Sequence, residues 1–181
     1  MDVISRGEAP VLVHVLPRLE GEDLAVATAT SREVSALHSD FTTLELELKG
    51  KAPQFKVRQV SKRKFALSVE GSFDEIGDLF LSVPYVGDRG LAFVGGELVA
   101  DHFYYGRPWE ISLKRFEAQL EGEEMIFVFH PMYERYEYMV DLEYSGLKPD
   151  FGVADTFLKI DPFRFETERR GVLVLGSKPE R

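Results

Sequence analysis

The 181-residue sequence contains no cysteine. Disulfide bonds, thiol nucleophiles and thiolate metal sites are therefore excluded, and stability must come from packing. Long hydrophobic runs are also missing, since none approaches the roughly 20 residues that cross a bilayer. The first residues lack the basic stretch and long apolar core of a secretory signal. We therefore expect no membrane association and a cytoplasmic location.

Several catalytic signatures are absent as well. The sequence has no Gly-x-Ser-x-Gly, Walker or dinucleotide-binding fingerprint. There is no His-x-His pair, and the spacing of His102 and His130 fits no common metal site. We therefore expect no cofactor. A structural calcium ion held by carbonyl groups and by Asp88 or Asp155 remains open, because such sites leave little trace in a sequence.

Positive charge is scarce: 22 Lys and Arg stand against 31 Asp and Glu, for a net charge of −9. Such a chain repels phosphate backbones, so we expect no nucleic-acid partner, whereas an uncharged sugar meets no penalty. Only residues 51–64 are basic. They form either a surface for an anionic partner or the solvated face of a hairpin that pairs residues 54–60 with 64–69. The basic side chains are Lys51, Lys56, Arg58, Lys62, Arg63 and Lys64.

Length and composition, with 44% hydrophobic and 29% charged residues, predict one domain over residues 1–181. Residues 177–181 are expected to form a flexible tail. Short apolar runs recur about every ten residues between Gly, Pro and Asp turns, which predicts an all-β antiparallel sandwich, and specifically a jelly roll. Residues 111–120 are the one candidate helix. The predicted strands are 10–16, 23–29, Thr42–Leu48, 54–60, 64–69, 79–83, 91–94, 125–129, Met139–Tyr144, 157–160, 163–168 and 171–175.

Residues 79–129 form the centre of the predicted fold. Gly95-Gly96 can supply the positive φ angles of a two-residue hairpin turn. The polar and aromatic loop at residues 101–109 follows, and it contains the only Trp of the chain. Loops on a rigid sheet often carry function.

The residues of this loop and of the preceding turn suit a sugar, because a pyranose offers apolar C–H faces to aromatic rings and hydroxyl groups to polar side chains. In the alternative interpretation, Trp109 and Tyr104 close the end of the sandwich and Arg107 pairs with Glu110 or Asp101. A second aromatic cluster, residues 130–138, is either a partner interface or a partly buried strand edge. The predicted carbohydrate-binding residues are Asp88, Arg89, Asp101, His102, Tyr104, Tyr105, Arg107 and Trp109.

The central block resembles a known family. Tyr85-Val86-Gly87-Asp88, the run from Gly95 to Asp101, the run from Phe103 to Ile111, and Leu113-Lys114-Arg115-Phe116 are similar to the non-catalytic jelly-roll domains of β-galactosidases. These domains belong to glycoside hydrolase family 35 and to related family 2 enzymes. Many relatives have Asn or Asp before Gly at the hairpin turn, where this chain has Gly95-Gly96.

The resemblance implies a galactose-binding-like fold of two antiparallel sheets. The catalytic carboxylates of those hydrolases lie on a TIM barrel of about 250 residues, for which this sequence is too short. We therefore expect a non-catalytic accessory domain or small subunit, which recognises a galactoside or packs on a hydrolase barrel. The alternatives are a protein-interaction or homo-oligomer module, and a small jelly-roll enzyme that modifies sugars.

Overall fold

The computed structural model describes residues 2–16, 18, 24–27, 29–35 and 38–175. Strands make up 53% of the structure and helices 8%, and the sheets are antiparallel. The prediction of an all-β antiparallel fold is thereby confirmed. The expected flexible tail at 177–181 lies outside the described residues.

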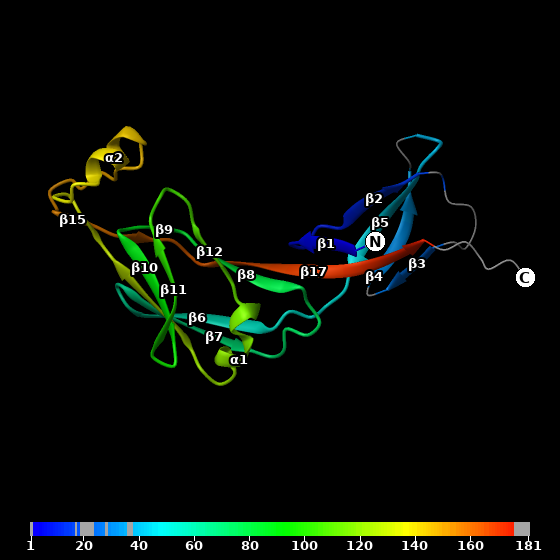
Figure 1. Cartoon of the computed structure of the whole chain (residues 1–181), viewed down its shortest axis with the longest axis horizontal. Coiled ribbons are helices and arrows are strands. Elements are labelled where there is room, and N and C mark those ends of the chain that lie inside the picture. Colours follow the sequence, from blue (N-terminus) through cyan, green and yellow to red (C-terminus); the bar gives the residue numbers. More distant parts are fainter. Residues whose placement is uncertain (1, 17, 19–23, 28, 36–37, 176–181) are drawn as a thin grey trace, which may run out of the picture. The chain divides into compact units, whose positions relative to one another are not determined.

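The chain divides into two compact units (Figure 1). Unit 1 comprises Met1–Ala52, Ser72–Leu79 and Glu166–Arg181, and unit 2 comprises Pro53–Gly71 and Phe80–Phe165. The expectation of one domain over residues 1–181 stays a prediction.

Unit 1 contains a three-stranded sheet in the order β2 (Val11–Val15), β5 (Thr42–Leu48), β4 (Ala29–Val34). Strand β17 (Arg164–Leu175) pairs in this unit with β1 (Asp2–Arg6) and β3 (Leu24–Ala27). The sequence predicted β5 with its bounds, because apolar residues alternate along it. Strands β1 and β4 were not predicted.

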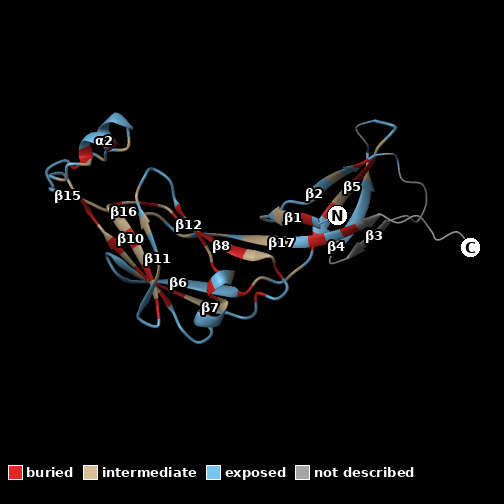
Figure 2. Cartoon of the chain, viewed as in Figure 1, coloured by how far each residue is buried: buried red, intermediate tan, exposed pale blue. Residues whose placement is uncertain are grey.

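The core of unit 1 is apolar and small. Figure 2 shows buried positions on strands β5 and β17, and the buried leucines of β5 alternate along it on one face. The Arg169 side chain links two backbone segments of this unit. Its Nη1 donates to the Gly7 carbonyl oxygen at 3.1 Å, and its Nε donates to the Gly50 carbonyl oxygen at 3.3 Å. The buried core side chains are Val3, Val15, Leu44, Leu46, Leu48 and Leu173.

Unit 2 is built on a five-stranded antiparallel sheet in the order β11-β10-β13-β7-β6. The predicted hairpin of β10 and β11 is confirmed, and Gly95 and Gly96 turn it with φ angles of 58° and 86°. The predicted hairpin of β6 and β7 is also confirmed. The strands are β6 (Gln54–Ser61), β7 (Lys64–Glu70), β10 (Arg89–Val94), β11 (Glu97–Phe103) and β13 (Met125–His130).

Two shorter strand pairs contribute aromatic and aliphatic side chains to the inner face of this sheet. They are β8 (Asp78–Val83) with β12 (Trp109–Ser112), and β9 (Tyr85–Val86) with β16 (Lys159–Ile160). Trp109 contacts Phe127, Tyr85 contacts Phe129, and Phe163 contacts Phe65, Phe127 and Phe129. Aromatic packing therefore dominates the core of unit 2.

The predicted strand Met139–Tyr144 is wrong, because these residues form helix α2. Met139 and Leu142, three positions apart, are its buried residues and pack with Met132 and Phe151 in a separate apolar cluster. This cluster also brings β14 (Met132–Tyr133) and β15 (Thr156–Phe157) together. The apolar and acidic residues of Met139–Tyr144 are compatible with a helix as well as with a strand. Six residues are too few for the hydrophobic periodicity to distinguish the two.

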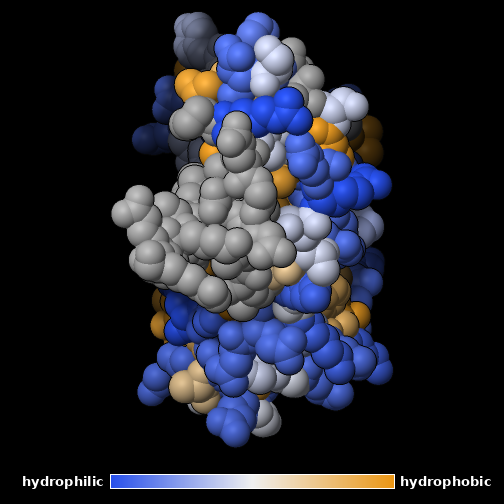
Figure 3. All heavy atoms as spheres, turned by 90° about the vertical axis from the view of Figure 1, so that its right-hand side faces the viewer, coloured by the Kyte–Doolittle hydropathy of each residue, from blue (hydrophilic) through white to orange (hydrophobic). Residues whose placement is uncertain are grey.

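The predicted helix at 111–120 is correct only in its second half. Ile111 and Ser112 belong to β12, and a 3₁₀ turn η1 (Lys114–Phe116) leads into α1 (Glu117–Leu120). The longest helix in the described part of the chain is α2, with six residues, so no helix there could span a membrane. On the face seen in Figure 3, hydrophilic side chains predominate and hydrophobic ones are scattered.

Candidate functional site

Several of the predicted sugar-binding residues lie on strands, although the sequence predicted a loop for them. Asp101 and His102 are part of β11, and Trp109 opens β12, so the connecting loop is shorter than residues 101–109. Tyr104, Tyr105 and Arg107 remain in that loop, with Tyr105 and Arg107 exposed. Asp88 precedes β10, and Arg89 is its first residue.

Trp109 is sealed in the sandwich, with an exposed fraction of 4%. The imidazole of His102 stacks on the indole at 5.7 Å with an interplanar angle of 11°, and Phe127 meets it edge-on at 5.8 Å. Gly90, opposite His102 in the sheet, leaves room for the indole. With 4% of its surface exposed, the indole is unavailable for stacking on a pyranose.

His102 is held by Tyr85. The Tyr85 hydroxyl group donates to the His102 carbonyl oxygen at 2.8 Å and lies 2.9 Å from His102 Nδ1. One phenol has one proton, so Nδ1 carries the other proton and donates to the phenol oxygen. Nε2 is then an unprotonated nitrogen, buried without a partner among the described residues.

Burial decides the charge of this pair. It lowers the pKa of His102, although the nearby Asp101 carboxylate acts in the opposite direction. Burial likewise raises the pKa of Tyr85. A neutral imidazole and a protonated phenol pack together without charge, so this pair stabilises the sandwich and provides no activated nucleophile.

Asp88 is tied down by three hydrogen bonds. Its backbone N–H donates to the His130 carbonyl oxygen at 2.8 Å, its carbonyl oxygen accepts from the Tyr104 N–H at 3.1 Å, and Oδ1 accepts from the Tyr138 hydroxyl group at 2.7 Å. Burial, then the bond to Asp88 and its charge, raise the pKa of Tyr138. Asp88 therefore anchors the turn to the aromatic segment around Tyr138.

The structure brings only some of the predicted residues together. The ring of His102 contacts those of Tyr105 and Trp109, and the Asp88 carbonyl oxygen accepts a hydrogen bond from the Tyr104 N–H. Asp101 and Trp109 border a small polar hollow of about 240 Å³, together with Glu110 and Arg115. Arg89 has a buried Nε without a partner in the described residues. Arg107 stands in the exposed loop.

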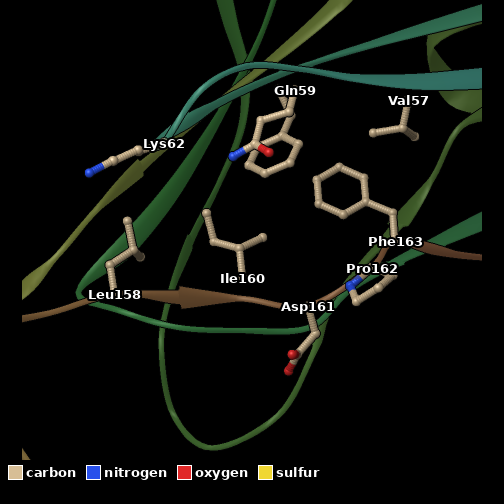
Figure 4. A pocket seen from close by; sticks show the side chains of 9 residues that line it. Val57, Gln59, Lys62, Leu158, Ile160, Asp161, Pro162 and Phe163 are labelled. Atoms are coloured by element: carbon tan, nitrogen blue, oxygen red, sulfur yellow. The ribbon is translucent and has the colours of Figure 1, made fainter.

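A larger groove, which the sequence did not predict, opens between β6 and residues 158–163 of unit 2. Its volume is about 470 Å³, within the range of roughly 300–1,000 Å³ that small-molecule sites occupy. Unlike Trp109, the rings of Phe65 and Phe163 are partly exposed. The groove is lined by Val57, Gln59, Lys62, Phe65, Leu158, Ile160, Asp161, Pro162 and Phe163 (Figure 4).

Strand pairing and backbone hydrogen bonds position the residues on both sides of the groove. Along β6, Val57 and Gln59 point to the face that carries Leu67 and Phe65 of β7, as the pairing of these residues shows. On the other wall, the Asp161 N–H donates to the Pro84 carbonyl oxygen at 2.9 Å and β16 pairs with β9, which hold residues 159–161 in place. The alternation of Phe55, Val57 and Gln59 with basic residues was the available sequence signal for the first wall.

The described residues contain no group of three or more His, Asp or Glu side chains that could hold a metal ion. Comparison with protein-family models, curated proteins and solved structures finds no significant match to this chain.

Proposed function

We propose that this chain is a non-catalytic β-sandwich module that recognises carbohydrate. The observation that supports this function best is the groove between β6 and residues 158–163. It combines an aromatic and aliphatic floor with an amide, an ammonium group and a carboxylate at its edges. Small-molecule sites share this character of an apolar lining with few polar groups.

The chemistry of the groove matches a pyranose. Phe65 and Phe163, whose ring centroids lie 5.3 Å apart, offer partly exposed apolar surface to the C–H groups of a sugar ring. Gln59 can both donate to and accept from hydroxyl groups, and Asp161 can accept from them. In Figure 4 the Gln59 amide lies over the groove, and the Asp161 carboxylate points away from it toward the edge.

The finer proposal is a jelly-roll, galactose-binding-like domain of the β-galactosidase type, which binds galactosides or packs on a hydrolase barrel. The resemblance of residues 85–116 supports it. These residues form β9, the β10–β11 hairpin and β12, in the order that such domains have. Under this proposal, ligand recognition lies at the groove instead of at Trp109.

Isothermal titration calorimetry with galactose, lactose and β-galactan oligomers tests this function. Gln59→Leu should weaken sugar binding severalfold, because it removes the amide and keeps the side-chain bulk. Gln54→Leu is the matched control, since Gln54 lies on the same strand and pairs with Glu70 away from the groove. No binding at millimolar sugar, or equal effects of both substitutions, would contradict the proposal.

A second candidate function, a protein-interaction or homo-oligomer module, is favoured by the outer face of the five-stranded sheet. Leu91 is opposite Val128 there, and Phe93 is opposite Ile126 and Leu98. The four β10 and β13 side chains are partly exposed, while Leu98 is 55% exposed and Phe103 61% exposed. Contiguous apolar surface of this kind marks interaction sites.

Light scattering separates the two functions. A binding module for sugar alone should be monomeric, whereas docking through the outer face should give an oligomer or a complex with a hydrolase. Phe103→Ser should disrupt that association. Tyr144→Ser, at an 88% exposed position on α2, is the control.

A further inference from the structure

We propose that the sugar bound in the groove carries a carboxylate, as a uronic acid does, and that Lys62 binds this carboxylate. This inference rests on the proposed carbohydrate function and names the class of sugar. The charges that line the groove are those of Lys62 and Asp161. The two groups differ in whether another charge is already bound to them.

The negative charge in the groove is already bound. Lys159 Nζ lies 3.1 Å from both oxygens of the Asp161 carboxylate, so this pair is neutral as a whole. Lys62, at the turn between β6 and β7, forms no ion pair or hydrogen bond with the part of the chain that the structure describes. The groove therefore has one uncompensated charge, and it is positive.

Lys62 is also the only cation of the basic stretch that lines the groove. Lys56 and Arg58 pair with Ser68 and Ala66, which places them on the opposite face of the sheet from Gln59 and Phe65. On that face Arg58 is bound to Glu124 at 3.0 Å. The basic stretch is thus divided between two faces, and a polyanion surface over all of it is not formed.

The position of Lys62 fits one end of a sugar ring. Figure 4 shows its ammonium group projecting at the edge of the groove, away from the ring of Phe163. A ring whose C–H face covers Phe65 and Phe163 would present an edge substituent toward this end. A neutral CH₂OH group there would leave the ammonium in water, whereas a carboxylate forms a charge-assisted hydrogen bond with it.

A matched ligand pair tests this inference: oligogalacturonate and its methyl ester, which has the same ring without the charge. Calorimetry at low ionic strength should show about three- to five-fold tighter binding of the acid, the size expected for a partly exposed ion pair. The preference should vanish at about 0.5 M salt, where the Debye length falls below roughly 5 Å. Acetate alone should not bind, because it lacks the ring.

The variants Lys62→Ala and Lys56→Ala remove the same charge from opposite faces of one hairpin. Lys62→Ala should abolish the preference for the acid over the ester, and Lys56→Ala should preserve that preference. Equal binding of acid and ester would overturn the inference and leave the proposed function standing. Loss of the preference in both variants would overturn the assignment to Lys62. If the acid, the ester and neutral galactan all fail to bind, both proposals are refuted.

Discussion

Replacing Gly90 by alanine puts a methyl group into close contact with Trp109 and Phe129. The added Cβ would lie 2.9 Å from Cζ3 and 3.0 Å from Cε3 of the indole, and 3.2 Å from Cε1 of Phe129. His102 stacks on the indole and Phe127 makes an edge contact with it, and both contacts oppose a displacement of the ring. Gly90 has no positive φ angle, so the strain arises from packing and not from the backbone.

Overpacking of this kind costs about 1–3 kcal/mol. For a chain of this length each kcal/mol corresponds to roughly 2–4 °C, so Gly90→Ala should lower the melting temperature by about 2–12 °C. Thermal and urea unfolding followed by circular dichroism, a signal that does not depend on Trp109, measures this directly. Trp109→Phe removes Cζ3 and Cε3 of the indole, so the cost of Gly90→Ala should shrink in that background. If Gly90→Ala leaves stability unchanged or raises it, the packing explanation is refuted. The same holds if the substitution lowers stability equally with Trp109 and with Phe at that position.

Three further predictions concern unit 2. Tyr138→Phe removes the 2.7 Å bond to Asp88 and should lower the free energy of unfolding by about 1–2 kcal/mol in urea titrations. Leu142→Ala should cost about 2 kcal/mol or more because Leu142 is buried, whereas Val140→Ala, exposed on the same helix, should change stability by less than about 0.5 kcal/mol; equal costs would contradict the packing assigned to α2. Burial lowers the pKa of His102 below 6.5, so the unfolded state binds more protons and stability should fall as the pH drops through about 6.5 toward the pKa of the folded state. His102→Gln should flatten this part of the pH profile, as repeated urea titrations between neutral and mildly acidic pH would show, and an unchanged profile would contradict the assignment.

Local sequence signals predicted the hairpins of unit 2 well. Gly95 and Gly96 adopt the positive φ angles that a two-residue turn requires. The β6–β7 hairpin has its turn at Lys62 and Arg63, as the sequence predicted. Both features depend on neighbours in sequence. The same reasoning failed for Met139–Tyr144, because this segment is a helix that buries Met139 and Leu142 in a cluster with Met132 and Phe151, residues outside the segment.

The candidate site was less accessible to sequence reasoning. The burial of Trp109 depends on Gly90, which is almost twenty positions away and gives no sign of its partner. The groove depends on two segments, around Gln59 and Ile160, that are about a hundred positions apart. Aromatic content identified residues with large surfaces to bury, but it could not tell the sealed indole from the partly exposed rings of Phe65 and Phe163.

The path of the chain through unit 1 has a consequence for biosynthesis. Strand β17 pairs with β1 and β3, yet nearly all of unit 2 precedes it in the sequence. On a ribosome, unit 2 can complete its five-stranded sheet as soon as β13 emerges, whereas β1 and β3 must wait for their partner. The early strands therefore carry unpaired backbone edges during elongation, and a nascent chain arrested before residue 164 should depend on holdase chaperones to keep them from aggregating.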